Sequence, residues 1–440
     1  MVDLPPQIHI EPPLFNSANP WATTLEDLQS LYKCTATGAV TTRTALLEQG
    51  FPHDESVHQF AFFETATHSS SSASAGPRKT RGGVDDGQGG REGDASLNTL
   101  GYSPIPLDEY LGFIRRIDEE EEEESEGPEE EHHPSSATAK GDDSGGAGTR
   151  RKKPFIVSVT GSPDEVAECY RRIAWCRFSG RRRGGEPGRR DGGGGGGGVV
   201  SREGKGVGLP LAMEVNLSCP NIPGKPPPAY EGEALRTYIR RVAEAAREVA
   251  EQVRADRGAD AAGGEQDAGG GEFRIPWGLK TPPYTHAGQF EMFVEALRGC
   301  SSSLPLSLSL SPGKAAAVAT CPVSFVTATN TLGSCLLLAE SSGGGLLSPA
   351  LPGRGIGGLA GAPLHPLALG NVATLRRMLD AAPETRHVAL LGIGGVGDAE
   401  AYRRMRSVGA VAVGVGTALG RKGVGVFDEI ERGLGGRWEV

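Results

Sequence analysis

Residues 213–226 read Met-Glu-Val-Asn-Leu-Ser-Cys-Pro-Asn-Ile-Pro-Gly-Lys-Pro. An apolar run ends in Asn216, and Cys219 follows three residues later, at the start of a loop rich in Pro and Gly. A short buried strand that delivers an amide and a thiol onto a rigid loop predicts the edge of an active site. Taken alone, the stretch is equally well explained as a strand, a turn and a structural cysteine, because a free cysteine is often core filler.

The composition indicates a globular core interrupted by low-complexity segments. The chain has 440 residues, and 66 of them are Gly, which is about twice the usual share. Segments rich in Gly, Ser or charge predict five disordered insertions, at 68–96, 118–153, 180–208, 255–271 and 301–314. The remaining residues, about 310, suit one barrel with decoration, so we expect a single domain over residues 1–440.

Several classes of protein are disfavoured. The net charge of −10 argues against a general nucleic-acid binder. Seven cysteines without a CxxC pair indicate a reducing compartment and no zinc site, so no metal is expected. The N-terminus does not resemble a signal peptide, and no apolar stretch reaches about 18 residues. We therefore expect a cytoplasmic protein with neither a membrane nor a nucleic-acid partner.

Eight apolar segments have the character of strands. They lie near residues 13, 38, 155, 212, 276, 323, 388 and 410. Helical periodicity is found at 25–32, 107–117, 164–177, 234–254, 286–297, 367–379, 398–408 and 424–434. This alternation predicts an α/β protein with a parallel (β/α)8 barrel, the TIM-barrel fold. The segments from residue 50 onward and over 336–354 are expected to be loops.

Polar and small residues follow the predicted strands, where a barrel of this kind carries its catalytic groups. These residues are Ser17 with Ala18, Arg43, Asn216 with Cys219, Lys280, Asn330, Gly394 with Gly395, and Gly416 with Thr417. The two glycine-containing ends follow strands seven and eight, where barrels commonly hold a phosphate with backbone N–H groups. Residues 355–358 precede this pair and are either part of the same nest or only a flexible loop.

This set of groups favours redox chemistry with proton removal over hydrolysis. An Asn amide offers a donor and an acceptor, which suits a ring with alternating C=O and N–H groups. A buried cation stabilises negative charge that develops on a cofactor. A cysteine on a loop removes a proton when its thiolate is favoured. No Ser-His-Asp order, HExxH motif or Walker loop is visible in the sequence.

The motifs resemble those of dihydroorotate dehydrogenases, specifically the soluble class 1A enzymes. The matching blocks are 216–226, 278–284, 355–361, 366–372, 391–396 and 415–417. The similarity follows the whole core in order and skips only the insertions. The block Asn-Leu-Ser-Cys-Pro-Asn at 216–221 is highly specific.

The resemblance implies an FMN-dependent barrel that oxidises (S)-dihydroorotate to orotate in pyrimidine (UMP) biosynthesis. It also implies fumarate as the electron acceptor and a homodimer without an iron–sulfur subunit. Cys219 would be the base that takes the C5 proton while the C6 hydride goes to flavin N5. Lys280 would lie against the flavin and stabilise its reduced anion.

Further site residues follow from the resemblance alone. The implied substrate contacts are Arg43, Asn98, Leu100, Gly101, Tyr102, Asn216, Asn221, Asn330 and Thr331. The implied FMN contacts are Ser17, Ala18, Arg43, Thr44, Asn216, Lys280, Gly358, Gly394, Gly395, Gly416 and Thr417.

The chain departs from the family pattern mainly on the substrate side. Arg43 stands where the family has Lys, and the two side chains are not equivalent although both are cationic. Residues 102–104, 333–335 and the turn at 17–20 differ as well. Two alternatives therefore stay open. One is a flavin oxidoreductase acting on a related dihydropyrimidine or cyclic imide. The other is a catalytically inactive flavin-binding barrel that serves as a scaffold, against which the intact Cys219 and Lys280 argue.

Overall fold

The computed structural model describes residues 4–74, 93–125, 152–178, 206–218, 227–260, 273–301, 319–340 and 347–439. Cys219 and Asn221 lie outside the described residues, as does most of each predicted insertion. Within the described ranges, no helix is long and apolar enough to cross a membrane.

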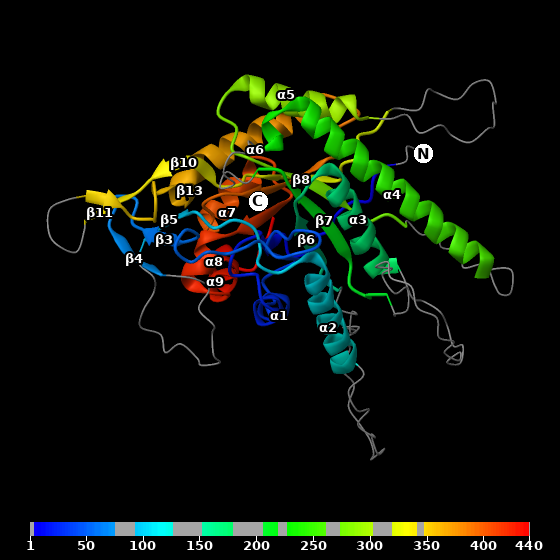
Figure 1. Ribbon diagram of the computed structural model, residues 1–440, viewed down its shortest axis with the longest axis horizontal. Coiled ribbons are helices and arrows are strands. Elements are labelled where there is room, and N and C mark those ends of the chain that lie inside the picture. The colour runs from blue at the N-terminus through cyan, green and yellow to red at the C-terminus, as the bar shows by residue number, and fades with distance from the viewer. Residues whose placement is uncertain are drawn as a thin grey trace, which may run out of the picture.

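Eight parallel strands form one sheet that curls into a barrel at the centre of the molecule (Figure 1). In chain order they are β1 (Leu14–Asn16), β2 (Val40–Thr41), β6 (Phe155–Val159), β7 (Leu211–Asn216), β8 (Trp277–Thr281), β9 (Phe325–Ala328), β14 (Ala389–Ile393) and β15 (Ala412–Val415). The order around the sheet is β1-β15-β14-β9-β8-β7-β6-β2. A parallel bridge between Phe15 and Ala39 joins the two edges. The predicted (β/α)8 barrel is confirmed.

The strands are mostly apolar because both of their faces are buried. One apolar cluster fills the inside of the barrel and consists of Phe15, Ala39, Ile156, Ala212, Phe325, Leu391, Ile393 and Ala412. A much larger cluster lies between the strands and the surrounding helices. Gly278 makes room for the inner cluster, since a Cβ there would lie 2.3 Å from the Phe325 ring.

Helices surround the barrel (Figure 1). They are α1 (Leu25–Lys33), α2 (Leu107–Ser125), α3 (Pro163–Phe178), α4 (Gly232–Asp260), α5 (Ala287–Gly299), α6 (His365–Asp380), α7 (Ala399–Ser407), α8 (Thr417–Lys422) and α9 (Gly425–Leu434). The predicted helices are all found. Thr24 caps α1 with a hydrogen bond from the Asp27 N–H, and Asp398 caps α7 in the same way through the Ala401 N–H.

The predicted insertion boundaries at 118 and 255 were wrong, because α2 and α4 continue beyond them. Glu has a high helix propensity, so the acidic run can continue α2. Some of its side chains also contact the rest of the protein. Its Glu120 accepts a hydrogen bond from Gln29 of α1 at 2.7 Å, and Asp118 accepts one from the Gly208 N–H at 2.6 Å. The first turns of the acidic run therefore pack against the barrel domain.

A second sheet, antiparallel, lies to one side of the barrel mouth (Figure 1). Its strand order is β10 (Leu332–Leu336), β13 (Ile356–Gly361), β5 (Ala95–Asn98), β3 (Phe60–Phe63) and β4 (Ser70–Ser74). A separate hairpin joins β11 (Leu338–Glu340) to β12 (Leu347–Pro349). The loops predicted from residue 50 onward and over 336–354 were therefore wrong in these parts. The insertion predicted at 68–96 likewise contains β4 and the start of β5.

We predict that Gly278→Ala lowers the free energy of unfolding by about 1–3 kcal/mol, because its Cβ would overlap Phe325 inside the barrel. Urea denaturation followed by far-UV circular dichroism measures the change. Gly112→Ala in α2 is the matched control, since no atom lies within 4 Å of its added Cβ. The control should gain up to about 1 kcal/mol. Equal effects of the two substitutions would contradict this account of the barrel interior.

Candidate active site

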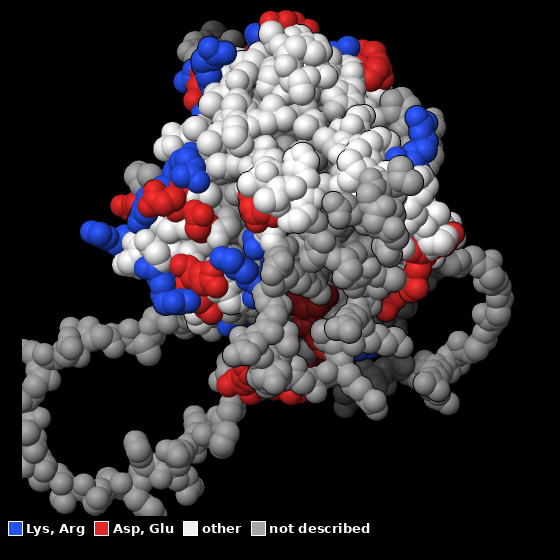
Figure 2. Space-filling view, turned by 90° about the vertical axis from the view of Figure 1, so that its left-hand side faces the viewer, with Lys and Arg blue, Asp and Glu red and all other residues white. Residues whose placement is uncertain are grey.

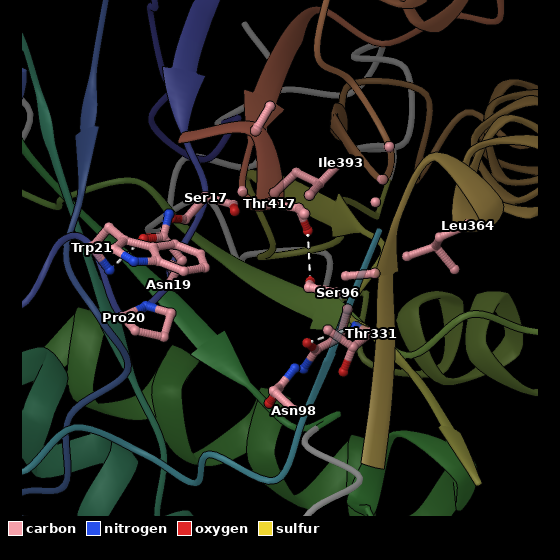
Figure 3. Close-up of a pocket in the computed structure, with 18 of the residues that line it drawn as sticks. Ser17, Asn19, Pro20, Trp21, Ser96, Asn98, Thr331, Leu364, Ile393 and Thr417 are labelled. Carbon is pink, nitrogen blue, oxygen red and sulfur yellow. Dashed lines mark hydrogen bonds between the residues drawn. The ribbon is translucent and has the colours of Figure 1, made fainter. Parts of the chain in front are cut away.

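The carboxyl ends of the barrel strands open into a cavity of about 450 Å³. One wall consists of the segments that follow the strands, and another is formed by Phe60, Ser96, Asn98 and Ala360 of the second sheet. Figure 3 shows this arrangement, with Trp21 and Leu364 on opposite sides. The volume lies in the range of small-molecule and cofactor sites.

Of the site residues that the sequence predicts and the structure describes, all but one line this cavity. Those that line it are Ser17, Ala18, Arg43, Thr44, Asn98, Leu100, Gly101, Tyr102, Asn216, Lys280, Asn330, Thr331, Gly394, Gly395, Gly416 and Thr417. Gly358 is not among the lining residues. It lies directly behind the wall, where its carbonyl accepts a hydrogen bond from Asn98 Nδ2 at 3.1 Å. Residues 355–358 are mostly strand, within β13, rather than a glycine nest or a flexible loop.

Several lining residues escaped the sequence prediction, among them Trp21, Phe60, Ser96, Thr329, Asp398, Arg421 and Lys422. Trp21 and Phe60 pack edge to face with ring centroids 5.6 Å apart, but Phe60 lies on a strand that the sequence did not predict. Arg421 and Lys422 end the short helix α8, which begins at Thr417. A basic pair one turn after the Gly-Thr end of the last strand was the signal available for them.

Two amides face each other at the carboxyl ends of β7 and β9. Asn216 Oδ1 accepts hydrogen bonds from Asn330 Nδ2 at 3.3 Å and from the Ser218 hydroxyl at 3.1 Å. Asn330 Nδ2 also donates to Ser218 Oγ at 3.0 Å, and Asn330 Oδ1 accepts from the Thr331 N–H at 2.8 Å. The orientation of both amides is therefore fixed by their neighbours.

Two buried cations line the cavity. Lys280 is 4% exposed, and its Nζ lies 4.0 Å from Oε1 of Glu214, which is 1% exposed. Arg43 is also 4% exposed, and its Nη2 donates to the Gly101 carbonyl at 3.3 Å and lies 2.9 Å from His53 Nε2. Burial, reinforced by the charge of Arg43, lowers the pKa of His53. Since a guanidinium only donates, the neutral His53 ring accepts from it and holds it at the wall.

The turn after β14 is built around two glycines with positive φ, Gly394 at 139° and Gly395 at 69°. A Cβ on Gly395 would lie 2.7 Å from the Gly361 carbonyl. The first residue of α6, His365, braces this turn through Nδ1, 2.7 Å from the Gly394 carbonyl oxygen. Arg404 Nε donates to His365 Nε2 at 3.2 Å, so the single ring N–H lies on Nδ1.

The turn after β15 lies beside the first. Thr417 begins α8, and its hydroxyl lies 3.0 Å from that of Ser96, the contact drawn in Figure 3. A Cβ on Gly416 would lie 2.9 Å from Ser17 Oγ. Backbone N–H groups, hydroxyls and the basic residues Arg421 and Lys422 thus meet at one end of the cavity. This combination suits a phosphate.

Within the described residues, no group of three or more His, Cys, Asp or Glu could hold a metal ion. The fold and cavity define a (β/α)8 barrel with a cavity at the carboxyl-terminal mouth, lined by two amides and two buried cations. The family model described as dihydroorotate dehydrogenase matches residues 208–437, which is more than half of the chain. The chain therefore belongs to the dihydroorotate dehydrogenase family.

Curated relatives agree with this assignment. The "Dihydroorotate dehydrogenase (fumarate)" of Trypanosoma cruzi is 32% identical over 282 residues, which cover 64% of this chain and 62% of the relative. The "Dihydroorotate dehydrogenase A (fumarate)" of Lactococcus lactis subsp. lactis is 27% identical over 221 residues, 50% of this chain and 53% of the relative. The chain thus spans a little over half the length of these relatives, which are of the fumarate type that the class 1A resemblance predicts.

A solved structure from Eimeria tenella, described as DHODH in complex with ferulenol, aligns with a TM-score of 0.53. The alignment covers 96% of this chain and 80% of that chain at 15% identity. At this identity the likeness concerns the fold alone.

We predict that the protein loses stability as the pH falls below 6.5, in part through His365. Burial lowers the folded-state pKa of His365 below its ordinary value of 6.5. The unfolded chain then binds more protons than the folded chain, so this contribution is complete above 6.5 and is lost on acidification. Urea midpoints measured between pH 7.5 and 5 should decrease.

His365→Gln keeps a hydrogen-bond donor near the Gly394 carbonyl but does not titrate. At pH 7.5 it should cost about 1 kcal/mol of unfolding free energy or less. Between pH 6.5 and 5 its midpoint should decrease less than that of the wild-type protein, which is the control. A decrease at least as steep as in the wild type would contradict the predicted role of His365.

Proposed function

We propose that this protein is an FMN-dependent dihydroorotate dehydrogenase of class 1A, which oxidises (S)-dihydroorotate to orotate in pyrimidine (UMP) biosynthesis and uses fumarate as its electron acceptor. The observation that carries the proposal is the meeting of Lys280, Asn216 and the Gly394–Gly395 turn in one cavity of a chain from this family. The cytoplasmic location and the absence of an iron–sulfur or nucleic-acid partner stay predictions from the sequence.

The residues present fit FMN. Glycine at 394 and 395 lets the backbone of this turn line the cavity at positions where an added Cβ would clash with the protein, and Arg421 and Lys422 add positive charge for a phosphate. The buried ammonium of Lys280 also lines the cavity, and its charge suits a ring system that becomes negative on reduction. Thr329 also lines the cavity, and its buried hydroxyl has no hydrogen-bond partner among the described residues.

Substrate recognition is assigned to the amides and to Arg43. Asn98, Asn216 and Asn330 offer donors and acceptors for the ring amide and imide groups, and Thr331 adds a hydroxyl. Arg43 suits the substrate carboxylate, because its planar group can bind both oxygens. Leu100, Gly101 and Tyr102 complete this wall, and Asn221 is assigned here from the resemblance.

Cys219 is assigned as the base, and it follows Ser218 at the carboxyl end of β7. Its thiolate would remove the C5 proton of the substrate, and the electron pair of that C–H bond would form the C5=C6 double bond as hydride leaves C6. Bound FMN would supply the acceptor for this hydride at N5.

One observation favours a second candidate, an oxidoreductase acting on a related dihydropyrimidine or cyclic imide. The cation that would meet the substrate is paired, Arg43 with His53, where the family pattern has a lysine, and Tyr102 also lines the cavity. A larger, shared cation changes the shape of the wall that would meet the substrate carboxylate.

A homodimer is part of the proposal. Large apolar side chains are exposed on the second sheet and its hairpin: Leu336, Leu338, Leu347 and Ile356. Figure 2 views the molecule from this side, and charged side chains there gather toward the edges of a largely uncharged area. Exposed apolar surface of this kind suits an interface.

Sedimentation velocity should give twice the monomer mass, and a monomer at micromolar concentration would exclude a stable dimer.

The proposed activity has a direct test. Purified protein should carry FMN with a flavin absorption spectrum, which (S)-dihydroorotate bleaches under anaerobic conditions and fumarate restores. Bleaching only by another dihydropyrimidine would establish the second candidate. A flavin that no such substrate bleaches would point to an inactive scaffold, and protein unable to bind FMN would exclude all three.

We predict that Cys219→Ser slows flavin reduction by dihydroorotate at neutral pH by about 10²–10⁴-fold, because a hydroxyl without a helper is a much weaker base than a thiol. Anaerobic stopped-flow absorbance measures this rate. Cys34→Ser is the control, since Cys34 follows α1 and is absent from the lining of the cavity. Unchanged reduction in Cys219→Ser would remove Cys219 from the role of base.

A further inference from the structure

A series of buried polar side chains connects Lys280 with the amide of Asn216 at the base of the cavity. Glu214 Oε1 lies 4.0 Å from Lys280 Nζ and accepts a hydrogen bond from the Ser158 hydroxyl at 2.8 Å. Ser158 Oγ lies 3.0 Å from Thr44 Oγ1, which accepts from Asn216 Nδ2 at 3.0 Å. Each of these five side chains is at most 6% exposed.

The barrel puts these groups together. Ser158, Glu214 and Lys280 belong to the neighbouring strands β6, β7 and β8, in which Ser158 pairs with Glu214 and Asn216 pairs with Lys280. Ala212, two residues before Glu214, belongs to the apolar cluster inside the barrel. Because alternate residues of a strand share a face, Glu214 and Asn216 also point inward, one above the other.

The direction of each hydrogen bond in this series follows from Glu214. A carboxylate only accepts, so Ser158 uses its one proton toward Glu214. Ser158 must then accept from Thr44, and Thr44 must accept from the Asn216 amide. The Nδ2 of Asn216 is thereby directed to Thr44, and its Oδ1 is left for Ser218 and Asn330.

Glu214 also sets the charge of this region. A buried ammonium is costly without a counter-charge, and Glu214 is the carboxylate that the structure pairs with Lys280. The carboxylate offsets part of the positive charge that Lys280 presents to the cavity.

We propose that Glu214 is a positioning residue with two effects: it limits the positive charge at the flavin through Lys280, and it fixes the substrate-binding amide of Asn216 through Ser158 and Thr44. The inference rests on the proposed function, because it concerns the flavin and the orotate that this function requires.

Glu214→Gln tests the effect on charge. The neutral variant leaves the charge of Lys280 uncompensated, which favours reduced, anionic flavin. The equilibrium between oxidised and reduced bound FMN should shift about tenfold toward the reduced form. This shift corresponds to a rise of about 30 mV in the midpoint potential of a two-electron couple. The potential is measured anaerobically with dithionite and a reference dye, so the result does not depend on the identity of the substrate.

Ser158→Ala separately tests the relay, the series of hydrogen bonds from Glu214 through Ser158 and Thr44 to Asn216. The substitution keeps the charge of Glu214 and removes the hydroxyl between Glu214 and Thr44. Orotate affinity, measured from the perturbation of the flavin spectrum, should fall by about two- to tenfold. The reduction equilibrium of bound FMN should stay within about threefold of the wild-type value. This arm tests the relay even when Glu214→Gln cannot be purified folded.

An unchanged or lower potential in Glu214→Gln would overturn the charge effect, and wild-type orotate affinity in Ser158→Ala would overturn the relay. Equal shifts of the potential in both variants would indicate only a structural disturbance and would also overturn the inference. In all three cases FMN is bound and the proposed function stands. A wild-type protein that takes up no FMN would overturn the proposed function and the inference together.

Discussion

Closure of the eight-stranded sheet is the constraint on which the site depends. Where β1 meets β15, the Ser17 N–H donates to the Val415 carbonyl at 2.9 Å. On the other side, the Asn16 side chain donates to the Thr41 carbonyl at 2.6 Å and accepts from the Thr41 N–H at 2.9 Å. The first and last strands are thereby joined, and Ser17 comes to lie beside Gly416. Without this closure the cavity would lack the wall that adjoins the glycine turns.

The parts of this arrangement that the sequence predicts are those with a strong local pattern. Strands such as β14 and β15 are buried on both faces and are therefore almost entirely apolar, which a sequence displays directly. Once their order is known, the residue that follows each strand is placed at the mouth without further information. This is why Lys280, Asn216 and the Gly394–Gly395 turn could be brought together in advance.

The second sheet could not be predicted in this way. Its strand β13 pairs with β5, more than 250 residues earlier, and Gly358 lies opposite Asn98 in that ladder. β13 reads Ile-Gly-Gly-Leu-Ala-Gly, which locally favours a loop, since glycine is depleted in strands. Only pairing with a distant segment makes it a strand. Ser96 and Phe60 reach the cavity on this sheet and were missed, whereas Asn98 was placed by family resemblance alone.

The barrel interior therefore contains two regions with different requirements. Lower down, Phe325 and Ile156 fill the space with apolar side chains and need only a matching volume. Higher up, Glu214, Ser158 and Lys280 occupy inward positions where an apolar residue would cause no desolvation cost. A buried ion pair of this kind is rarely more stable than well-packed apolar residues, so stability alone does not account for it. A requirement for oriented charge and oriented amides at the mouth accounts for the buried pair. The polar region lies directly beneath that mouth.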